Sequence, residues 1–239
     1  MTYIAMWSGP RNISTALMRS FGNRPDTSVI DEPFYGYYLK KTNSNHPYSS
    51  KIINLYETKY NKIVNQLTGP IPSNKPIWYQ KHMAHHILPK DDLNWIKKIN
   101  NCILIRHPND VILSYINKFQ LESSYQLGYK QQDDLYNYLK LHNISPIVIE
   151  SNDLVCNPEI ILNKLCNKLS IRFYKEMLFW PKGPRKTDGI WAKYWYDNVN
   201  CSQKFNLFVK QKQPVPELYK KIYSQSLHIY NRLFEFRLK

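Results

Sequence analysis

The sequence predicts an α/β fold in three layers, with helices covering both faces of a central parallel sheet. Short apolar runs alternate with amphipathic stretches along the chain, which is the pattern of parallel strands joined by crossover helices. The first apolar run passes through a tight turn directly into a helix start. With 239 residues, 43% of them hydrophobic, the chain can bury one sizeable core. We therefore expect residues 1–239 to form a single domain.

The first third of the chain contains two expected strands and two expected helices. Residues 2–7 form an apolar run that predicts a strand, and the hydroxyl-rich start of residues 13–23 predicts a helix. The segment Ser28-Val29-Ile30 predicts a second, short strand. Apolar side chains at helical spacing predict one helix over residues 49–67, which a Gly-Pro-Ile-Pro segment ends.

The middle of the chain repeats the alternation of strand and helix. Residues 76–81 predict the third strand, and residues 91–98 predict a short helix. The run at residues 101–106 has the apolar core of a buried strand and ends in a charged arginine. A proline in the first helical position then begins a helix over residues 108–119.

The last part of the chain contains one expected strand, three expected helices and a long loop. Helices are expected over residues 131–142 and 157–169, the second begun by an Asn-Pro pair. The fifth strand is expected at residues 146–150. Residues 173–200 are aromatic and basic without a period, which favours a functional loop over a core element. A final helix is expected at about residues 216–235.

Charge and cysteine usage limit the partners and the compartment. The formal net charge is +15, from 33 Lys and Arg against 18 Asp and Glu. Because the lysines are dispersed, we favour compositional drift plus one anion site over a nucleic-acid surface. Four scattered cysteines without zinc spacing indicate reduced thiols and a cytoplasmic location. The sequence shows neither a secretion signal nor an apolar run long enough for a transmembrane helix.

The turn after the first strand has the composition of an anion site. Free N–H groups and the positive end of a helix point at one spot, where an arginine adds a fixed charge and two hydroxyls add donors. The residues expected to bind there are Gly9, Pro10, Arg11, Asn12, Ile13, Ser14 and Thr15. The arrangement is P-loop-like, but the Walker pattern GxxxxGK[ST] is absent. The alternative is an ordinary capped turn without a ligand.

A second candidate anion site lies at the end of the buried strand 101–106. Arg106 ends this strand and Ser114 lies eight residues later, two turns into the next helix. A buried arginine must meet an anion or a carboxylate. An internal ion pair with Asp110 or Glu150 is the alternative.

These segments resemble those of the sulfotransferases that use 3′-phosphoadenosine 5′-phosphosulfate (PAPS). The pattern R-x-P-x-D-x-x-x-S at residues 106–114 is similar to their 3′-phosphate segment. The turn at residues 10–17, Pro-Arg-Asn-Ile-Ser-Thr-Ala-Leu, resembles their phosphosulfate loop P-[KR]-S-G-[ST]-[ST]-x-L, with Asn-Ile in place of Ser-Gly. Residues 152–159 resemble their E-D-L-x-x-x-P-E segment, and residues 182–191 resemble their late R-K-G-x-x-G-x-W loop. The four segments occur in the family's order.

The resemblance implies how a PAPS donor binds. Arg11 and the loop N–H groups would hold and stabilise the 5′-phosphosulfate, and Arg106 with Ser114 would hold the 3′-phosphate. Arg185 or Lys186, in the late loop at about residues 180–200, would close over the donor. Arginine suits both sites because its planar fork grips phosphate with two hydrogen bonds. No metal is expected, because His82, His85 and His86 have no carboxylate or cysteine in a ligand pattern with them.

The acceptor would be a hydroxyl of a small molecule or a glycan, and its proton needs a base. By resemblance, the base is either His82, which follows the third strand, or Glu32, which follows the second. A carboxylate in a closed pocket would have its pKa raised toward a useful value. Seven aromatic residues could line the acceptor pocket: Trp78, Tyr79, Trp180, Trp191, Tyr194, Trp195 and Tyr196.

Two other functions compete with a sulfotransferase. A small-molecule kinase on a modified P-loop would need Mg²⁺ ligands, and no hydroxyl after a lysine supplies them. A non-catalytic nucleotide- or nucleic-acid-binding protein would use the positive charge, with binding that depends strongly on salt.

Overall fold

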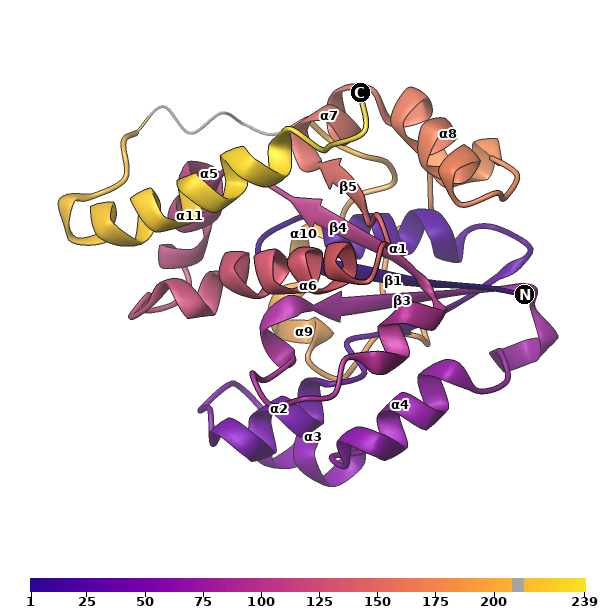
Figure 1. Cartoon of the computed structure of the whole chain (residues 1–239), viewed down its shortest axis with the longest axis horizontal. Coiled ribbons are helices and arrows are strands. Elements are labelled where there is room, and N and C mark those ends of the chain that lie inside the picture. Colours follow the sequence, from indigo (N-terminus) through magenta and orange to yellow (C-terminus); the bar gives the residue numbers. More distant parts are fainter. Residues whose placement is uncertain (208–212) are drawn as a thin grey trace.

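The protein is built on a five-stranded parallel sheet in the order β2-β3-β1-β4-β5 (Figure 1). The computed structural model describes residues 1–207 and 213–239. The strands are β1 Thr2–Ser8, β2 Thr27–Asp31, β3 Ile77–Met83, β4 Asn100–Ile105 and β5 Ile147–Glu150. Each lies where the apolar runs predict it, and the predicted α/β class is confirmed.

Period-two alternation in the strands builds two hydrophobic layers, one on each side of the sheet. In β1, Ile4 and Met6 face one layer, and Ala5 and Trp7 face the other. The first layer packs against α1 (Ser14–Gly22) and α8 (Pro158–Lys168). The second packs against four helices: α4 Tyr60–Thr68, α5 Pro108–Ile116, α6 Tyr129–Leu141 and α11 Lys220–Phe234. This is the expected three-layer arrangement.

The region between β2 and β3 differs from the prediction. The single helix expected over residues 49–67 is two helices, α3 Ser49–Leu55 and α4. They separate because the Glu57 carboxylate accepts hydrogen bonds from the N–H groups of the next two residues, at 2.9 and 2.8 Å, and so forms a turn. An additional helix, α2 Tyr35–Thr42, packs the rings of Tyr35 and Tyr38 against His85 and His86 in the turn after β3.

Several other helix boundaries also differ from the prediction. Helix α5 ends at Ile116, three residues before the predicted end at Phe119. The helix expected over residues 157–169 is preceded by a further short one, α7 Ser151–Cys156. The remaining elements are short: α9 Ala192–Trp195, α10 Asp197–Asn200, and the 3₁₀ turns η1 Pro72–Asn74, η2 Ala84–His86, η3 Asn94–Lys98, η4 Ser124–Leu127, η5 Lys175–Leu178 and η6 Glu217–Tyr219. The expected loop 173–200 therefore contains three helical turns.

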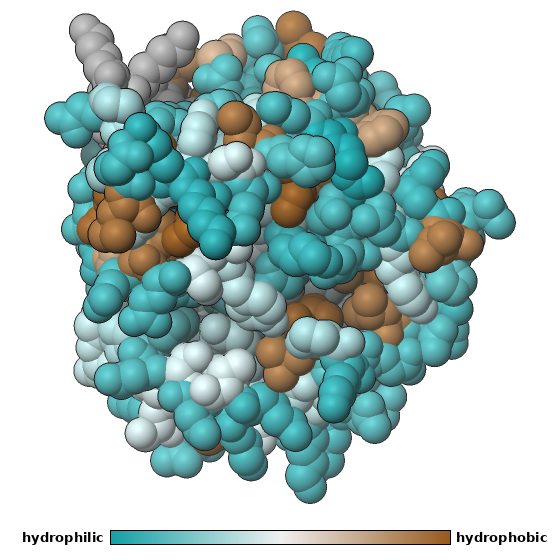
Figure 2. All heavy atoms as spheres, turned by 60° about the vertical axis from the view of Figure 1, so that its left-hand side comes forward, coloured by the Kyte–Doolittle hydropathy of each residue, from teal (hydrophilic) through white to brown (hydrophobic). Residues whose placement is uncertain are grey.

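The surface in Figure 2 is mostly hydrophilic, with hydrophobic side chains scattered over it. Across residues 1–207 and 213–239, no helix has the length and apolar character needed to cross a membrane.

Because all five strands are parallel, their carboxyl ends meet at one edge of the sheet. The strand register brings residues that are far apart in sequence into line at this edge. Asp31, the last residue of β2, pairs with Lys81, and Ser8, the last residue of β1, lies between Met83 and Leu104. The loops that leave this edge surround a large cavity.

Candidate active site

The cavity at the carboxyl edge of the sheet has a volume of about 860 Å³. One wall is the start of α1 with the turn before it, and another is formed by Arg106 and the exposed side of α5. Other parts are lined by the ends of β2 and β3, the loop after α2, the turn after β3, the loop after α5 and the segment from α9 to residue 207. The predicted anion turn and the predicted arginine of β4 thus line one cavity.

The turn before α1 leaves the first N–H groups of this helix without a side-chain partner among the described residues. Arg11 has a left-handed conformation, with φ of 59°. Among the described residues, no side chain caps the N-terminus of α1, and its first turn has no acidic residue. The first N–H groups of this helix are therefore available to an anion.

Asn12 and Gly9 fix this turn to the rest of the protein. The Asn12 amide donates to the carbonyl oxygen of Leu104 at 2.6 Å and accepts a hydrogen bond from the Ser151 hydroxyl. A Cβ atom on Gly9 would lie 2.3 Å from the carbonyl oxygen of Leu127, so only glycine fits there. Gly9 itself does not line the cavity. Asn12, which departs from the family's loop pattern, thus anchors the turn to β4 and α7.

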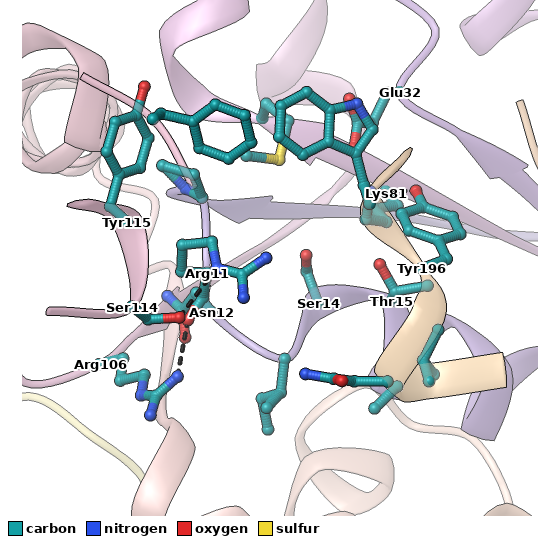
Figure 3. A pocket seen from close by; sticks show the side chains of 18 of the residues that line it. Arg11, Asn12, Ser14, Thr15, Glu32, Lys81, Arg106, Ser114, Tyr115 and Tyr196 are labelled. Atoms are coloured by element: carbon teal, nitrogen blue, oxygen red, sulfur yellow. Dashed lines mark hydrogen bonds and ion pairs between the residues drawn. The ribbon is translucent and has the colours of Figure 1, made fainter. Parts of the chain in front are cut away.

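The two predicted arginines meet at one end of the cavity. Arg11 Nε donates to the Ser114 hydroxyl at 2.9 Å, and Arg106 Nη1 donates to the Arg11 carbonyl oxygen at 2.8 Å. Figure 3 shows these groups beside the hydroxyls of Ser14 and Thr15. Burial lowers the pKa of both guanidinium groups, and an arginine side chain keeps its charge in proteins. This end of the cavity is therefore a cationic subsite made by two separate loops.

A buried lysine lies between two carboxyl groups at another part of the cavity wall. Lys81 Nζ contacts Asp31 Oδ1 at 2.9 Å, and it also contacts Glu32 Oε1. The Tyr196 hydroxyl lies 2.9 Å from Lys81 Nζ and donates to Asp31 at 2.8 Å. Burial alone would lower the pKa of Lys81, but the charges of Asp31 and Glu32 raise it well above its usual value. We call these four residues the lysine cluster.

Sequence reasoning missed Lys81 and Asp31 as site residues. The signal was present, because a lysine inside an apolar strand needs an anionic partner. The Asp-Glu pair at the end of the neighbouring strand supplies it, but only the strand register shows that the two meet.

Glu32 lies where the cavity meets the lysine cluster. Its backbone is left-handed, with φ of 45°, and its side chain is 11% exposed. Burial raises the pKa of the Glu32 carboxyl, the nearby Asp31 charge adds to this, and Lys81 opposes it. A carboxyl group with a raised pKa is suited to accept a proton near neutral pH.

The structure does not bring His82 to the cavity. Its ring stacks on Trp7 with centroids 4.3 Å apart, and its Nε2 lies 3.3 Å from Gln80 Oε1. Burial lowers the pKa of His82 to about 3. The strand alternation sends His82 into the second hydrophobic layer, whereas His85 and His86, in the turn that follows β3, line the cavity.

The late-loop cations also lie outside the cavity. The Arg185 guanidinium donates to carbonyl oxygens of its own turn, including that of Gly183 at 2.9 Å. Lys186 is exposed. The loop is held instead by Asp188, which forms an ion pair with Arg19 of α1 at 2.5 Å.

Of the seven aromatic residues expected around the acceptor, only Trp195 and Tyr196 line the cavity. The others lie elsewhere because they serve the hydrophobic layers or the surface. Trp78, Tyr79, Trp180 and Trp191 are buried core residues, and Tyr194 packs on Tyr48 outside the cavity.

Comparison with known proteins identifies the family of the chain. A family model described as "Sulfotransferase domain" matches residues 1–234. The chain belongs to the sulfotransferase family. Two Arabidopsis thaliana proteins, named branched-chain-amino-acid aminotransferase-like protein 2 and protein 1, are 33% and 34% identical to this sulfotransferase domain over 233 and 230 residues. These matches cover 98% and 96% of the chain but only 41% of each Arabidopsis protein.

Solved structures share the fold of this sulfotransferase domain. A sulfotransferase from Alicyclobacillus acidocaldarius matches with a TM-score of 0.58 at 10% identity, over 100% of this chain and 98% of that one. The sulfotransferase domain of the Synechococcus PCC 7002 olefin synthase matches with a TM-score of 0.53 at 14% identity, over 100% and 96%. That of the curacin biosynthetic pathway matches with a TM-score of 0.50 at 16% identity, over 94% and 96%.

Proposed function

We propose that this sulfotransferase domain transfers a sulfuryl group from PAPS to a hydroxyl group of a small-molecule or glycan acceptor. The observation that carries the proposal is the meeting of Arg11, Arg106 and Ser114 beside the uncapped start of α1. Two arginines from separate loops suit a donor that carries phosphate at both ends of its nucleoside.

The residues of the cationic subsite divide between the two ends of the donor. Ser14, Thr15 and the first N–H groups of α1, with Arg11, would hold the 5′-phosphosulfate. Arg106 and Ser114 would hold the 3′-phosphate. Arg185 and Lys186 have no place in this proposal, because neither lines the cavity.

Sulfuryl transfer forms a bond between the acceptor oxygen and sulfur. It breaks the bond between sulfur and the oxygen of the 5′-phosphate, and adenosine 3′,5′-bisphosphate (PAP) leaves. The acceptor proton needs a base, and we propose Glu32 for this role. Its place on the cavity and its raised pKa support this assignment over His82. Lys81 would hold the carboxyl group in place, and Arg11 would balance the charge on the transferring group.

A thermal-shift titration with PAP tests the donor assignment. We expect PAP to stabilise the wild type, because a ligand that binds only the folded state raises its unfolding temperature. Arg106→Ala removes a charged hydrogen-bond donor and should weaken PAP binding by about 10- to 100-fold. Arg172→Ala, at an exposed arginine outside the cavity, is the matched control and should bind PAP normally.

Three outcomes would count against the proposal. A wild type that PAP does not stabilise would refute the donor. An Arg106→Ala variant that responds like the control would refute the placement of the donor. Stabilisation by ATP with Mg²⁺ in place of PAP would instead favour a kinase.

A further inference from the structure

Three histidines line the cavity next to Glu32, and the proposed sulfuryl transfer does not use them. They are His46, from the loop after α2, and His85 and His86, from the turn after β3. We call them the imidazole cluster. Tyr35 connects them to Glu32: its N–H donates to the Glu32 carbonyl oxygen at 3.0 Å, its ring stacks on His86 at 4.8 Å, and its hydroxyl lies 2.8 Å from His46 Nδ1.

The imidazole rings are uncharged at neutral pH. Burial lowers the pKa of His46, lowers that of His85 to about 3, and lowers that of His86 well below its usual value. An uncharged ring carries one hydrogen-bond donor and one acceptor. The cluster can therefore bind a hydroxyl group, which also has both.

Two of these rings have a nitrogen atom without a hydrogen-bond partner within the described residues. His85 is 7% exposed and His86 is 2% exposed, and the enclosed Nδ1 atom of each has no hydrogen-bond partner in residues 1–207 and 213–239. Buried polar groups are rarely left unpaired, because each costs free energy. No hydrogen bond from Nε2 of either ring to these parts of the chain is present, and both residues line the cavity.

The surroundings of the cluster favour an uncharged ring compound. Trp195 packs edge-on against His46 with ring centroids 6.4 Å apart, and its ring is tilted by 45° to that of Phe119 at 4.5 Å. These aromatic rings offer an apolar wall to a flat molecule. The cations of the cavity come from segments other than those of the cluster. Arg11 and Arg106 form the cationic subsite, Lys81 is paired, and Lys204, which lines both the cavity and a groove at the start of α8, comes from the segment after α10.

We propose that the imidazole cluster is the acceptor subsite and binds an uncharged ring compound that has a second hydroxyl group. This second hydroxyl bonds to His85 or His86 while the first faces Glu32. The inference rests on the proposed sulfuryl transfer, since it names the acceptor class of the same cavity. An acceptor with a carboxylate or sulfate group would place that charge against neutral rings without a cation to pair with it.

Matched probes test the subsite in the PAP-loaded protein. Catechol and phenol differ by one hydroxyl, and 3,4-dihydroxybenzoate adds a negative charge to catechol. We expect the wild type to bind catechol about tenfold more tightly than phenol, because phenol leaves the imidazoles unpaired. The dihydroxybenzoate should bind more weakly than catechol. Isothermal titration measures all three, and transfer from radiolabelled PAPS to catechol is measured in parallel.

Substitutions separate hydrogen bonding from packing. The double variant His85→Phe with His86→Phe keeps two flat rings without ring nitrogens and should lose the preference for catechol. The double variant His85→Gln with His86→Gln places an amide near each Nε2 position and should keep part of it. His228→Phe, at an exposed histidine, is the control. An unchanged thermal shift with PAP shows that each variant is folded with an intact donor site.

The outcomes distinguish this inference from the proposed function. Equal binding of catechol and phenol by the wild type, no binding of either, or a preference that survives in the phenylalanine variant would overturn the subsite. Tight binding of the dihydroxybenzoate would overturn the uncharged acceptor class. A histidine-dependent preference for catechol without transfer from PAPS would uphold the subsite and refute the proposed function.

Discussion

Replacing Lys81 by methionine removes the cation between two buried carboxyl groups. The Lys81 and Asp31 side chains are each 1% exposed and that of Glu32 is 11% exposed, so water cannot replace the lost ammonium. Leaving a buried charge without its partner costs about 3–5 kcal/mol. For a domain of this size, each kcal/mol shifts the unfolding temperature by about 2–4 °C. We therefore expect Lys81→Met to unfold about 6–20 °C below the wild type at pH 7.

The loss of stability in the Lys81→Met variant should be larger at pH 7 than at pH 4. Lys81 is the largest influence that lowers the pKa of Glu32, so its removal raises this pKa further. A carboxyl group whose pKa is higher in the folded state than in the unfolded state binds its proton more tightly when the protein is folded. Such a group lowers the stability of the fold as the pH rises above the unfolded-state pKa of about 4.3. The stability deficit of the variant should thus shrink as the pH falls from 7 toward 4.

Thermal and urea unfolding across this pH range measure both effects. Lys62→Met is the matched control, because Lys62 is 65% exposed and its Nζ lies 3.8 Å from the Glu57 carboxylate. An exposed pair of this kind is worth less than about 1 kcal/mol. A Lys81→Met variant as stable as this control at pH 7, or a deficit that grows on acidification, would refute the reasoning.

Two further predictions concern Gly9 and His82. Gly9→Ala places a Cβ 2.3 Å from the Leu127 carbonyl oxygen and should lower the free energy of unfolding by about 1–3 kcal/mol, as measured by thermal unfolding. The control is Gly22→Ala, whose Cβ would meet its nearest neighbour at 3.5 Å and which should cost much less. Similar losses in the two variants would contradict the close approach at Gly9. Because the pKa of His82 is about 3, the unfolded state binds its proton more readily and stability falls as pH drops from about 6.5 toward 3. His82→Phe should make the fall of stability with pH shallower by up to about 1.4 kcal/mol per pH unit. The same variant should keep its sulfuryl transfer. Loss of the transfer would restore His82 as a candidate base.

The helix errors show how local patterns mislead. Residues 49–67 keep helical spacing throughout, but the Glu57 carboxylate bonds to the backbone of residues 58 and 59 and ends the first helix early. The helix at Tyr35–Thr42 was missed because its run of buried aromatic residues has no helical period. In the first case a local side-chain bond to the backbone ends the helix, and in the second the buried residues Tyr35 to Leu39 follow one another without helical spacing.

The predicted histidine, His82, does not reach the cavity because side chains of β3 alternate between the two faces of the sheet. His82 and His85 are three residues apart, and the sequence gives both the same chemistry. The last residues of β3 alternate between faces, so His82 enters the layer behind Trp7, whereas the 3₁₀ turn brings His85 to the cavity. The alternation of the strand and the turn that follows it thus decide which histidine lines the cavity.

The sequence by itself determined the α/β class and the place of all five strands, and it predicted Arg11 in one candidate anion site and Arg106 with Ser114 in a second. Apolar alternation and strand-end position are local properties, and parallel strands bring their carboxyl ends to one edge whatever the side chains are. Only the tertiary structure decided that Lys81 joins Asp31 and Glu32, that His85 and His86 replace His82 at the cavity, and that Arg185 turns away from it. Those outcomes depend on strand register and loop packing, which arise from contacts between residues far apart in the chain.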